Sequence, residues 1–104
     1  MKQDLALKNR VKEILKIVQQ VAPGNSVELR IPLYAAIQCV PGSVHRRGTP
    51  PNVVEMSGDT LLELVDDPNH WDEFCHIGRI LASGTNANLK DLFTQVSKLD
   101  SSTR

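Results

Sequence analysis

A stretch crowded with proline and glycine, residues 41–51, divides this chain and limits what it can fold into. Three of its eleven residues are proline and two are glycine. Proline lacks the backbone N–H that a helix interior or a central strand needs, and glycine favours turns. No helix or paired strand is therefore expected to cross this segment, and we predict that it forms the longest loop of the chain.

The pattern before this loop predicts one helix and two strands. Apolar positions within residues 5–21 recur at the spacing of an amphipathic helix with one buried stripe. A proline and a glycine within residues 22–25 end that helix. Residues 27–31 alternate apolar and charged side chains, as in a strand with one buried face. The apolar run at 34–40 predicts a strand covered on both faces, in which Gln38 needs a buried partner.

The pattern directly after the loop predicts a strand followed by a helix. Residues 52–56 have strand character because of their adjacent valines. Thr60 and Glu63 have the spacing of a capping box, in which each side chain satisfies a backbone N–H at a helix start. Asp67 and Pro68 suit the N-cap and first position of a further short helix.

The last third of the chain predicts two helices with a strand between them. Residues 78–84 read as a strand bracketed by glycines, and Asn88 suits the N-cap of the last helix. The polar ends, 1–4 and 100–104, are expected to fray. The inner face of the short helix consists of Trp71, Phe74 and Cys75, and that of the last helix of Leu89, Leu92, Phe93, Val96 and Leu99.

These elements predict a single α+β domain over residues 1–104, with a mostly antiparallel sheet of about four to five strands packed against helices. A domain of this size buries roughly two-thirds of the surface that the unfolded chain exposes, so its core needs no disulfide or metal. We expect Cys39 and Cys75 to remain thiols in a reducing cytoplasm.

The charge balance argues against several classes of partner. Twelve Lys and Arg residues balance twelve Asp and Glu residues, so no long-range field would attract nucleic acid or an anionic membrane. No apolar run is long enough for a secretory signal or a membrane-spanning helix, which predicts a cytoplasmic protein without integral membrane association.

The order of elements from residue 52 onward resembles the sterol-carrier-protein fold. The glycine-flanked strand at 78–84 is the most telling part of this resemblance. Upstream, residues 23–30, 38–39 and 45–55 resemble a bacterial branch of that family, formed by small stand-alone sterol-carrier-like proteins. The matches together span roughly residues 11–97.

The resemblance implies a layered domain whose helices and sheet enclose an apolar tunnel for fatty acyl chains or sterols. It implies no particular ligand for this branch, and the low aromatic content of 4% argues against a large sterol pocket. Two interpretations of the apolar stripes stay open, a lined cavity and an ordinary packed core. The candidate apolar lining consists of Tyr34, Leu62, Trp71, Phe74, Leu92, Phe93 and Val96.

The candidate polar contacts lie in the long loop and on two strands. His45, Arg46 and Arg47 gather three potentially cationic groups with no acid between them, which suits a carboxylate or phosphate. The alternative is a solvated loop whose arginines pair with nearby acids. For Glu55 and Arg79 the simplest expectation is a cross-strand ion pair. The more specific alternative is that the two side chains orient a ligand.

No pattern indicates catalysis, a cofactor or a metal centre. Cys39 with His45 lacks any nucleophile signature, and Cys39 is expected to be buried in a strand. Asp72 and His76 stand at helical i, i+4 spacing, but exposed helix polarity explains them better than metal binding. No glycine-rich phosphate loop or paired-cysteine zinc spacing occurs.

Two functions follow from these observations. The first is a non-enzymatic carrier for an apolar, acyl-like molecule whose anionic head lies near Arg46 and Arg47. The second is an interaction module with a packed core, which docks through residues 41–51 on a protein partner or on a second copy to form a homodimer.

Overall fold

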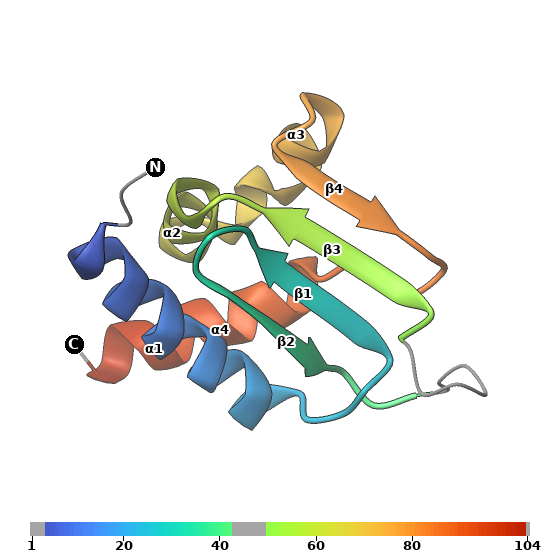
Figure 1. Cartoon of the computed structure of the whole chain (residues 1–104), viewed down its shortest axis with the longest axis horizontal. Coiled ribbons are helices and arrows are strands. Elements are labelled where there is room, and N and C mark those ends of the chain that lie inside the picture. The colour runs from blue at the N-terminus through green and yellow to red at the C-terminus, as the bar shows by residue number, and fades with distance from the viewer. Residues whose placement is uncertain (1–3, 43–49, 104) are drawn as a thin grey trace.

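The computed structural model describes residues 4–42 and 50–103 and confirms the predicted α+β class. The elements alternate as the sequence pattern predicts, with helices first and last and a split helical segment before the final strand (Figure 1). In chain order they are α1 (Leu5–Val21), β1 (Val27–Ile31), β2 (Ala35–Cys39), β3 (Asn52–Met56), α2 (Gly58–Asp66), η1 (Pro68–His70), α3 (Trp71–His76), β4 (Ile80–Ser83) and α4 (Lys90–Thr103).

The four strands form one mixed sheet in the order β2-β1-β3-β4. The outer pairs, β1 with β2 and β3 with β4, are antiparallel, whereas the central pair β1 and β3 is parallel. Val27 at the start of β1 therefore lies opposite both Cys39, at the end of β2, and Asn52, at the start of β3. The carboxyl ends of β2 and β4 thus lie beside the amino ends of β1 and β3, at one end of the sheet.

The helices cover one face of the sheet and leave the other open. In Figure 1 the viewer looks onto the open face, and α4 passes behind the strands. Alternate residues of β1 point into the helical layer and are fully buried, as the predicted alternation requires. Burying each such side chain contributes about 1.5–3 kcal/mol relative to leaving it exposed. The fully buried core includes Val11, Ile14, Val18, Val27, Leu29, Ile31, Val54, Leu61, Leu64, Phe93 and Val96.

The prediction that residues 34–40 form a strand covered on both faces is wrong. β2 is the last strand on its side of the sheet, and Ala36 and Gln38 are exposed on the open face. Gln38 needs no buried partner, although its backbone oxygen accepts a 3.5 Å hydrogen bond from Nε2 of Gln19. The composition of β2 resembles that of a central strand because Ile37 and Cys39 face the core, while Ala36, which faces solvent, is also apolar.

The predicted capping box at Thr60 and Glu63 is also wrong, because α2 begins earlier. Ser57 is the N-cap, and its Oγ accepts from the backbone N–H of Thr60 at 3.1 Å. Thr60 is buried instead, and its Oγ1 accepts from Nε of Arg79 at 3.1 Å. The prediction for Asp67 as the cap of the next helix is confirmed, since its Oδ1 accepts from the N–H of Asn69.

The expected fraying at both ends does not occur at Asp4 or Asp100. Asp4 caps α1 by accepting from the N–H of Leu7 at 3.1 Å. α4 continues to Thr103, and Asp100 is only 4% exposed. Its two carboxylate oxygens accept from Nη1 and Nη2 of Arg10 at 2.7 and 2.5 Å. This bidentate pair ties the end of the last helix to the first helix, and it raises the pKa of Arg10.

We predict that Asp100→Ala lowers the free energy of unfolding by about 3 kcal/mol, because removing one partner leaves the Arg10 guanidinium partly buried without its carboxylate. Urea unfolding followed by circular dichroism measures this change. Asp72→Ala is the matched control, since Asp72 forms an exposed ion pair with Lys90 that contributes at most about 1 kcal/mol. Equal effects of the two substitutions would contradict a structural role for the buried pair.

Candidate functional site

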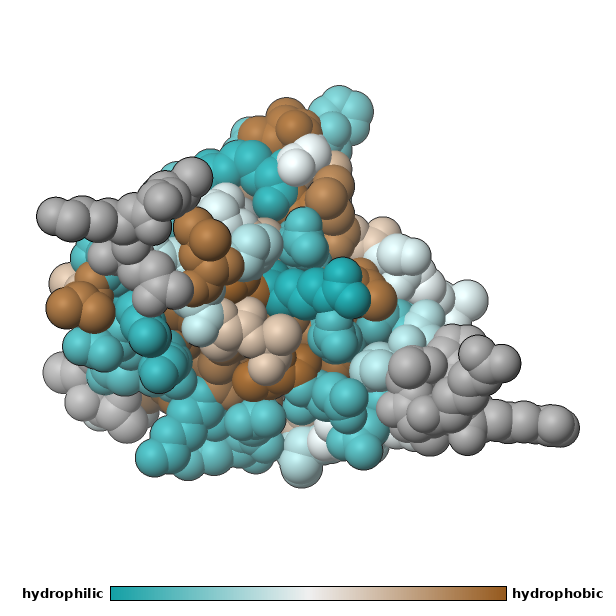
Figure 2. Space-filling model, viewed as in Figure 1, coloured by the Kyte–Doolittle hydropathy of each residue, from teal (hydrophilic) through white to brown (hydrophobic). Residues whose placement is uncertain are grey.

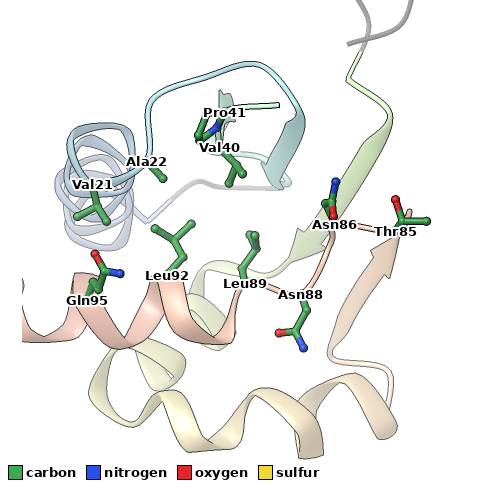
Figure 3. A pocket seen from close by; sticks show the side chains of 10 residues that line it. All are labelled: Val21, Ala22, Val40, Pro41, Thr85, Asn86, Asn88, Leu89, Leu92 and Gln95. Carbon is green, nitrogen blue, oxygen red and sulfur yellow. The ribbon is translucent and has the colours of Figure 1, made fainter. Parts of the chain in front are cut away.

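A hollow with a volume of about 570 Å³ lies where α1 ends, β2 ends and α4 begins. In Figure 3, Leu89, just before α4, and Leu92, in its first turn, point toward Val40 and Ala22 across the opening. The polar side chains stand at the rim of this apolar surface. The lining consists of Val21, Ala22, Val40, Pro41, Thr85, Asn86, Asn88, Leu89, Leu92 and Gln95. We call this space the α1–α4 pocket.

Val40 lines the α1–α4 pocket in a strained conformation. Its φ of 66° lies in the left-handed region, which β-branched residues rarely adopt. Three hydrogen bonds hold it there. Its N–H donates to the oxygen of Ala22 at 2.7 Å, and its own oxygen accepts from N and Oγ of Ser26 at 3.0 and 2.9 Å. Gly24 permits this approach, because a Cβ at that position would lie 2.3 Å from the Val40 oxygen.

Asn52 fixes the opposite wall of the pocket. Its side chain is 1% exposed, and Nδ2 donates to the backbone oxygen of Ser26 at 2.8 Å. Oδ1 accepts from the backbone N–H of Asn86 at 3.0 Å, which holds the connection between β4 and α4 against the sheet. Gly84 packs directly on this amide, since a Cβ there would lie 2.1 Å from Oδ1. Sequence reasoning missed Asn52, although a polar residue two positions before the buried Val54 on the same face of β3 was a usable signal.

The pocket is suited to an apolar molecule with one polar end. Its lining is about half apolar and half polar: aliphatic side chains come from the end of α1, the end of β2 and the start of α4, and neutral amide and hydroxyl groups come from Thr85, Asn86 and Gln95. Among the described residues, no charged side chain lines it. The arrangement supports burial and hydrogen bonding of a ligand.

Of the seven predicted apolar lining residues, the α1–α4 pocket includes Leu92. Phe93 and Val96 on the same helix are fully buried in the core, and Trp71 stacks on Phe93 with 6.3 Å between ring centroids. Phe74 is buried beneath the guanidinium of Arg79, which lies 4.3 Å from its ring centroid. The remaining two, Tyr34 and Leu62, are partly buried at the periphery of the core. The helical stripe therefore serves mostly as core, and Leu92 lies where that stripe reaches the pocket.

The expected ion pair between Glu55 and Arg79 is wrong. Arg79 precedes β4 and donates through Nη2 to Glu63, a bond that lowers the pKa of the Glu63 carboxyl. Glu55 lies in β3 with Arg30 and Leu81 as its neighbours across the sheet. Arg79 is drawn to α2 because its Nε also donates to Thr60, so both nitrogens bond to one helix. Both Glu55 and Arg79 line a smaller hollow on the open face of the sheet.

The predicted cationic residues His45, Arg46 and Arg47 lie outside the described residues. The chain on either side of them is described, and Pro41 on the amino-terminal side lines the α1–α4 pocket. Within residues 4–42 and 50–103, no three His, Cys, Asp or Glu side chains gather as a metal site. Over the same residues, no helix is both long and apolar enough to span a bilayer.

The two cysteines have the properties of structural thiols. Cys39 is fully buried, and burial raises its pKa from 9.0 to about 11. Burial also raises the pKa of Cys75, with a further contribution from the charge of Asp72. A thiol with a raised pKa is mostly protonated near neutral pH and is a weak nucleophile.

We predict that Asn52→Ala destabilises the fold and loosens the wall formed by residues 85–88. The substitution removes partners from a buried carbonyl and from the Asn86 N–H, each of which costs about 1–3 kcal/mol when left unpaired. Hydrogen exchange should show faster exchange at the Asn86 amide, and urea unfolding should show the loss of stability. The control is Asn69→Ala at an exposed position. Unchanged exchange at Asn86 would contradict the anchoring role.

We also predict that iodoacetamide at pH 8 modifies Cys75 before Cys39 in the folded protein, as mass spectrometry can measure.

The raised pKa of Cys39 also makes the stability of the fold depend on alkaline pH. Burial of the neutral Cys39 thiol contributes its full stability below the pKa of a cysteine in the unfolded chain. That stability is lost as pH rises from about 9 toward 11. Cys39→Ala should therefore flatten the alkaline loss of stability. Rapid modification of Cys39 in the native protein would contradict its burial.

One comparison with known proteins gives a match, and it covers most of the chain. The family model described as bacterial SCP ortholog matches residues 3–94. The matched region contains both central strands, α2, α3 and β4, and it ends within α4. It confirms the resemblance to small bacterial sterol-carrier-like proteins. No curated protein matches the chain.

Proposed function

Since the chain belongs to the family of bacterial SCP orthologs, we propose that it is a non-enzymatic carrier for an apolar, acyl-like molecule with an anionic head. The observation that carries this proposal is the α1–α4 pocket, because it offers an aliphatic surface at the junction of the helical layer and the sheet. Its volume of about 570 Å³ falls within the range of roughly 300–1,000 Å³ that small-molecule sites occupy.

The apolar tail is assigned to the surface formed by Leu89, Leu92 and Val40. Leu89 and Leu92 are 3% and 9% exposed and Val40 is partly buried, so the gain on binding would come mainly from removing the ligand's own CH₂ groups from water. Each CH₂ group so buried contributes about 0.8 kcal/mol. A few carbons alone would give affinity weaker than millimolar, so the proposal needs a longer buried segment together with a contact to the head group.

The anionic head is assigned to Arg46 and Arg47. The described lining of the pocket is neutral, so a charged partner for a carboxylate has to come from elsewhere in the chain. These arginines follow the lining residue Pro41 by five and six positions, and five extended residues reach at most about 18 Å. A guanidinium forms short, directional hydrogen bonds with a carboxylate or phosphate, which is why arginine fits this role.

Native mass spectrometry and thermal-shift titrations of the delipidated protein test the proposal. The probes are hexadecanoate, hexadecanoyl-CoA and cholesterol. A ligand at 100 times its dissociation constant should raise the free energy of unfolding by about 2.7 kcal/mol. We expect hexadecanoate or its CoA ester to bind and cholesterol to bind more weakly. Absence of bound mass and of any shift with all three probes would reject the proposal.

We predict that Arg46→Ala with Arg47→Ala weakens binding of hexadecanoate by about tenfold or more, because a hydrogen bond to a charged group contributes about 1.5–3 kcal/mol. The melting temperature should change little. Lys12→Ala with Lys16→Ala is the matched control, since it removes the same charge from exposed positions of α1. Equal weakening by both double variants would reject a specific role for the arginines, and a collapse of the melting temperature would assign them a structural one.

A further inference from the structure

Two smaller hollows lie side by side on the open face of the sheet, away from the α1–α4 pocket. One has a volume of about 360 Å³ and lies between the β1–β2 turn, the start of α2 and Arg79. The other has a volume of about 440 Å³ and lies over β3 and β4 beside Cys75. Glu55 and Leu81 line both, so the two hollows form one groove. Figure 2 looks onto this face and shows hydrophobic surface between hydrophilic residues across its middle.

The groove has apolar walls that are open to solvent. Leu81 is 58% exposed and Leu33 is 55% exposed. Leu33 has a φ of 73° in a turn closed by the N–H of Tyr34 donating to Ile31 at 3.0 Å, with Pro32 before it. The third position of such a turn usually holds glycine or asparagine. An exposed leucine there is strained, which is the kind of outlier that suggests a binding role.

The charges around the groove are not balanced. Arg79 is engaged by Glu63, and Arg30 donates through Nε to Glu28, so each guanidinium already has a carboxylate. Glu55 feels the charge of Arg30 across the strands, but no ion pair joins them among the described residues.

Two acids thus remain at the groove without an ion pair within 4–42 and 50–103, although Arg30 acts on Glu55 and Arg79 on Asp59 at longer range. Glu55 lies at its centre and Asp59 at one end. Among the described residues, the charged side chains that line the two hollows are these two acids and one guanidinium, Arg79, which Glu63 already engages.

We propose that this groove is a second binding site, which takes an organic cation with an apolar body, such as a protonated primary amine carrying an alkyl chain. The ammonium group donates to the Glu55 carboxylate, and the alkyl chain lies against Leu81 and toward Leu33. Glu55 is only partly exposed and lies between Leu81 and Arg30 across the sheet, and a charge-assisted hydrogen bond to a partly buried carboxylate is stronger than one in bulk water. The site differs from the α1–α4 pocket in both place and charge, so neither depends on the other.

Titration of the full chain with octylamine, octan-1-ol and octanoate at pH 7, followed by ¹⁵N–¹H NMR, tests this site. Octylamine is protonated at this pH, as a lysine side chain is. We expect octylamine to shift the amides of Val53, Glu55 and Leu81, and octan-1-ol to do so more weakly. Glu55→Gln should reduce octylamine affinity by about tenfold. The matched control Glu13→Gln removes the same charge from an exposed position of α1 and should leave affinity unchanged.

Several results would overturn the inference. Octan-1-ol binding in the groove as tightly as octylamine would show that charge plays no part. Equal affinities of Glu55→Gln and Glu13→Gln would remove Glu55 from the site, and shifts confined to the α1–α4 pocket would remove the site itself. The octanoate titration separates this outcome from the carrier proposal, because octanoate is expected to shift Leu89 and Gln95 instead.

Discussion

The parallel pairing of β1 and β3 at the centre of the sheet is the constraint on which the rest of the structure depends. The amide of Asn52 holds this pair in register at one end, because it opens β3 and donates to the backbone of Ser26 just before β1. Since β2 and β4 run antiparallel to these two strands, both end where the central strands begin. The segments that leave β2 and β4 therefore emerge at one edge, and there they form two walls of the α1–α4 pocket.

The same pairing brings a different set of connections to the opposite edge. The β1–β2 turn, the step from β3 to α2 and the approach to β4 all lie there, and together they form one half of the open-face groove. The two edges differ in charge for a topological reason. At the first edge, the side chains of Ser26 and Asn52 donate hydrogen bonds to backbone oxygens and hold the backbone in place. At the second, Glu55 lies partly exposed on the uncovered face of β3, between the core residues Val54 and Met56.

Periodicity within single elements was enough to predict most of the fold. The stripe of α1 and the alternation of β1 depend only on neighbouring residues, and both predictions are confirmed. The errors concern interactions between residues distant in the chain. Asp100 lies in a polar tail whose composition suggests fraying, and its contact with Arg10, 90 positions away, ties that turn to α1. Arg79 was assigned to Glu55 by strand proximity, whereas the hydrogen bonds available on α2 take it to Glu63.

The candidate sites were harder to predict because they depend on backbone conformation as well as side-chain type. Among the described residues, Leu33 and Val40 are the two non-glycine residues with positive φ. They bracket β2 on either side, and each lines a different hollow. A left-handed conformation costs an ordinary side chain roughly 1–2 kcal/mol, which a glycine would avoid.

At both positions, however, glycine would also remove an apolar wall. Three hydrogen bonds offset the strain at Val40, and the closed turn offsets it at Leu33. The backbone that surrounds β2 thus holds an aliphatic side chain at the mouth of each hollow, at positions where local conformational preference alone would favour a residue without one. The fold therefore keeps apolar surface at these two positions although the local backbone conformation favours glycine there. This is the physical reason for treating both hollows as binding sites rather than as gaps in packing.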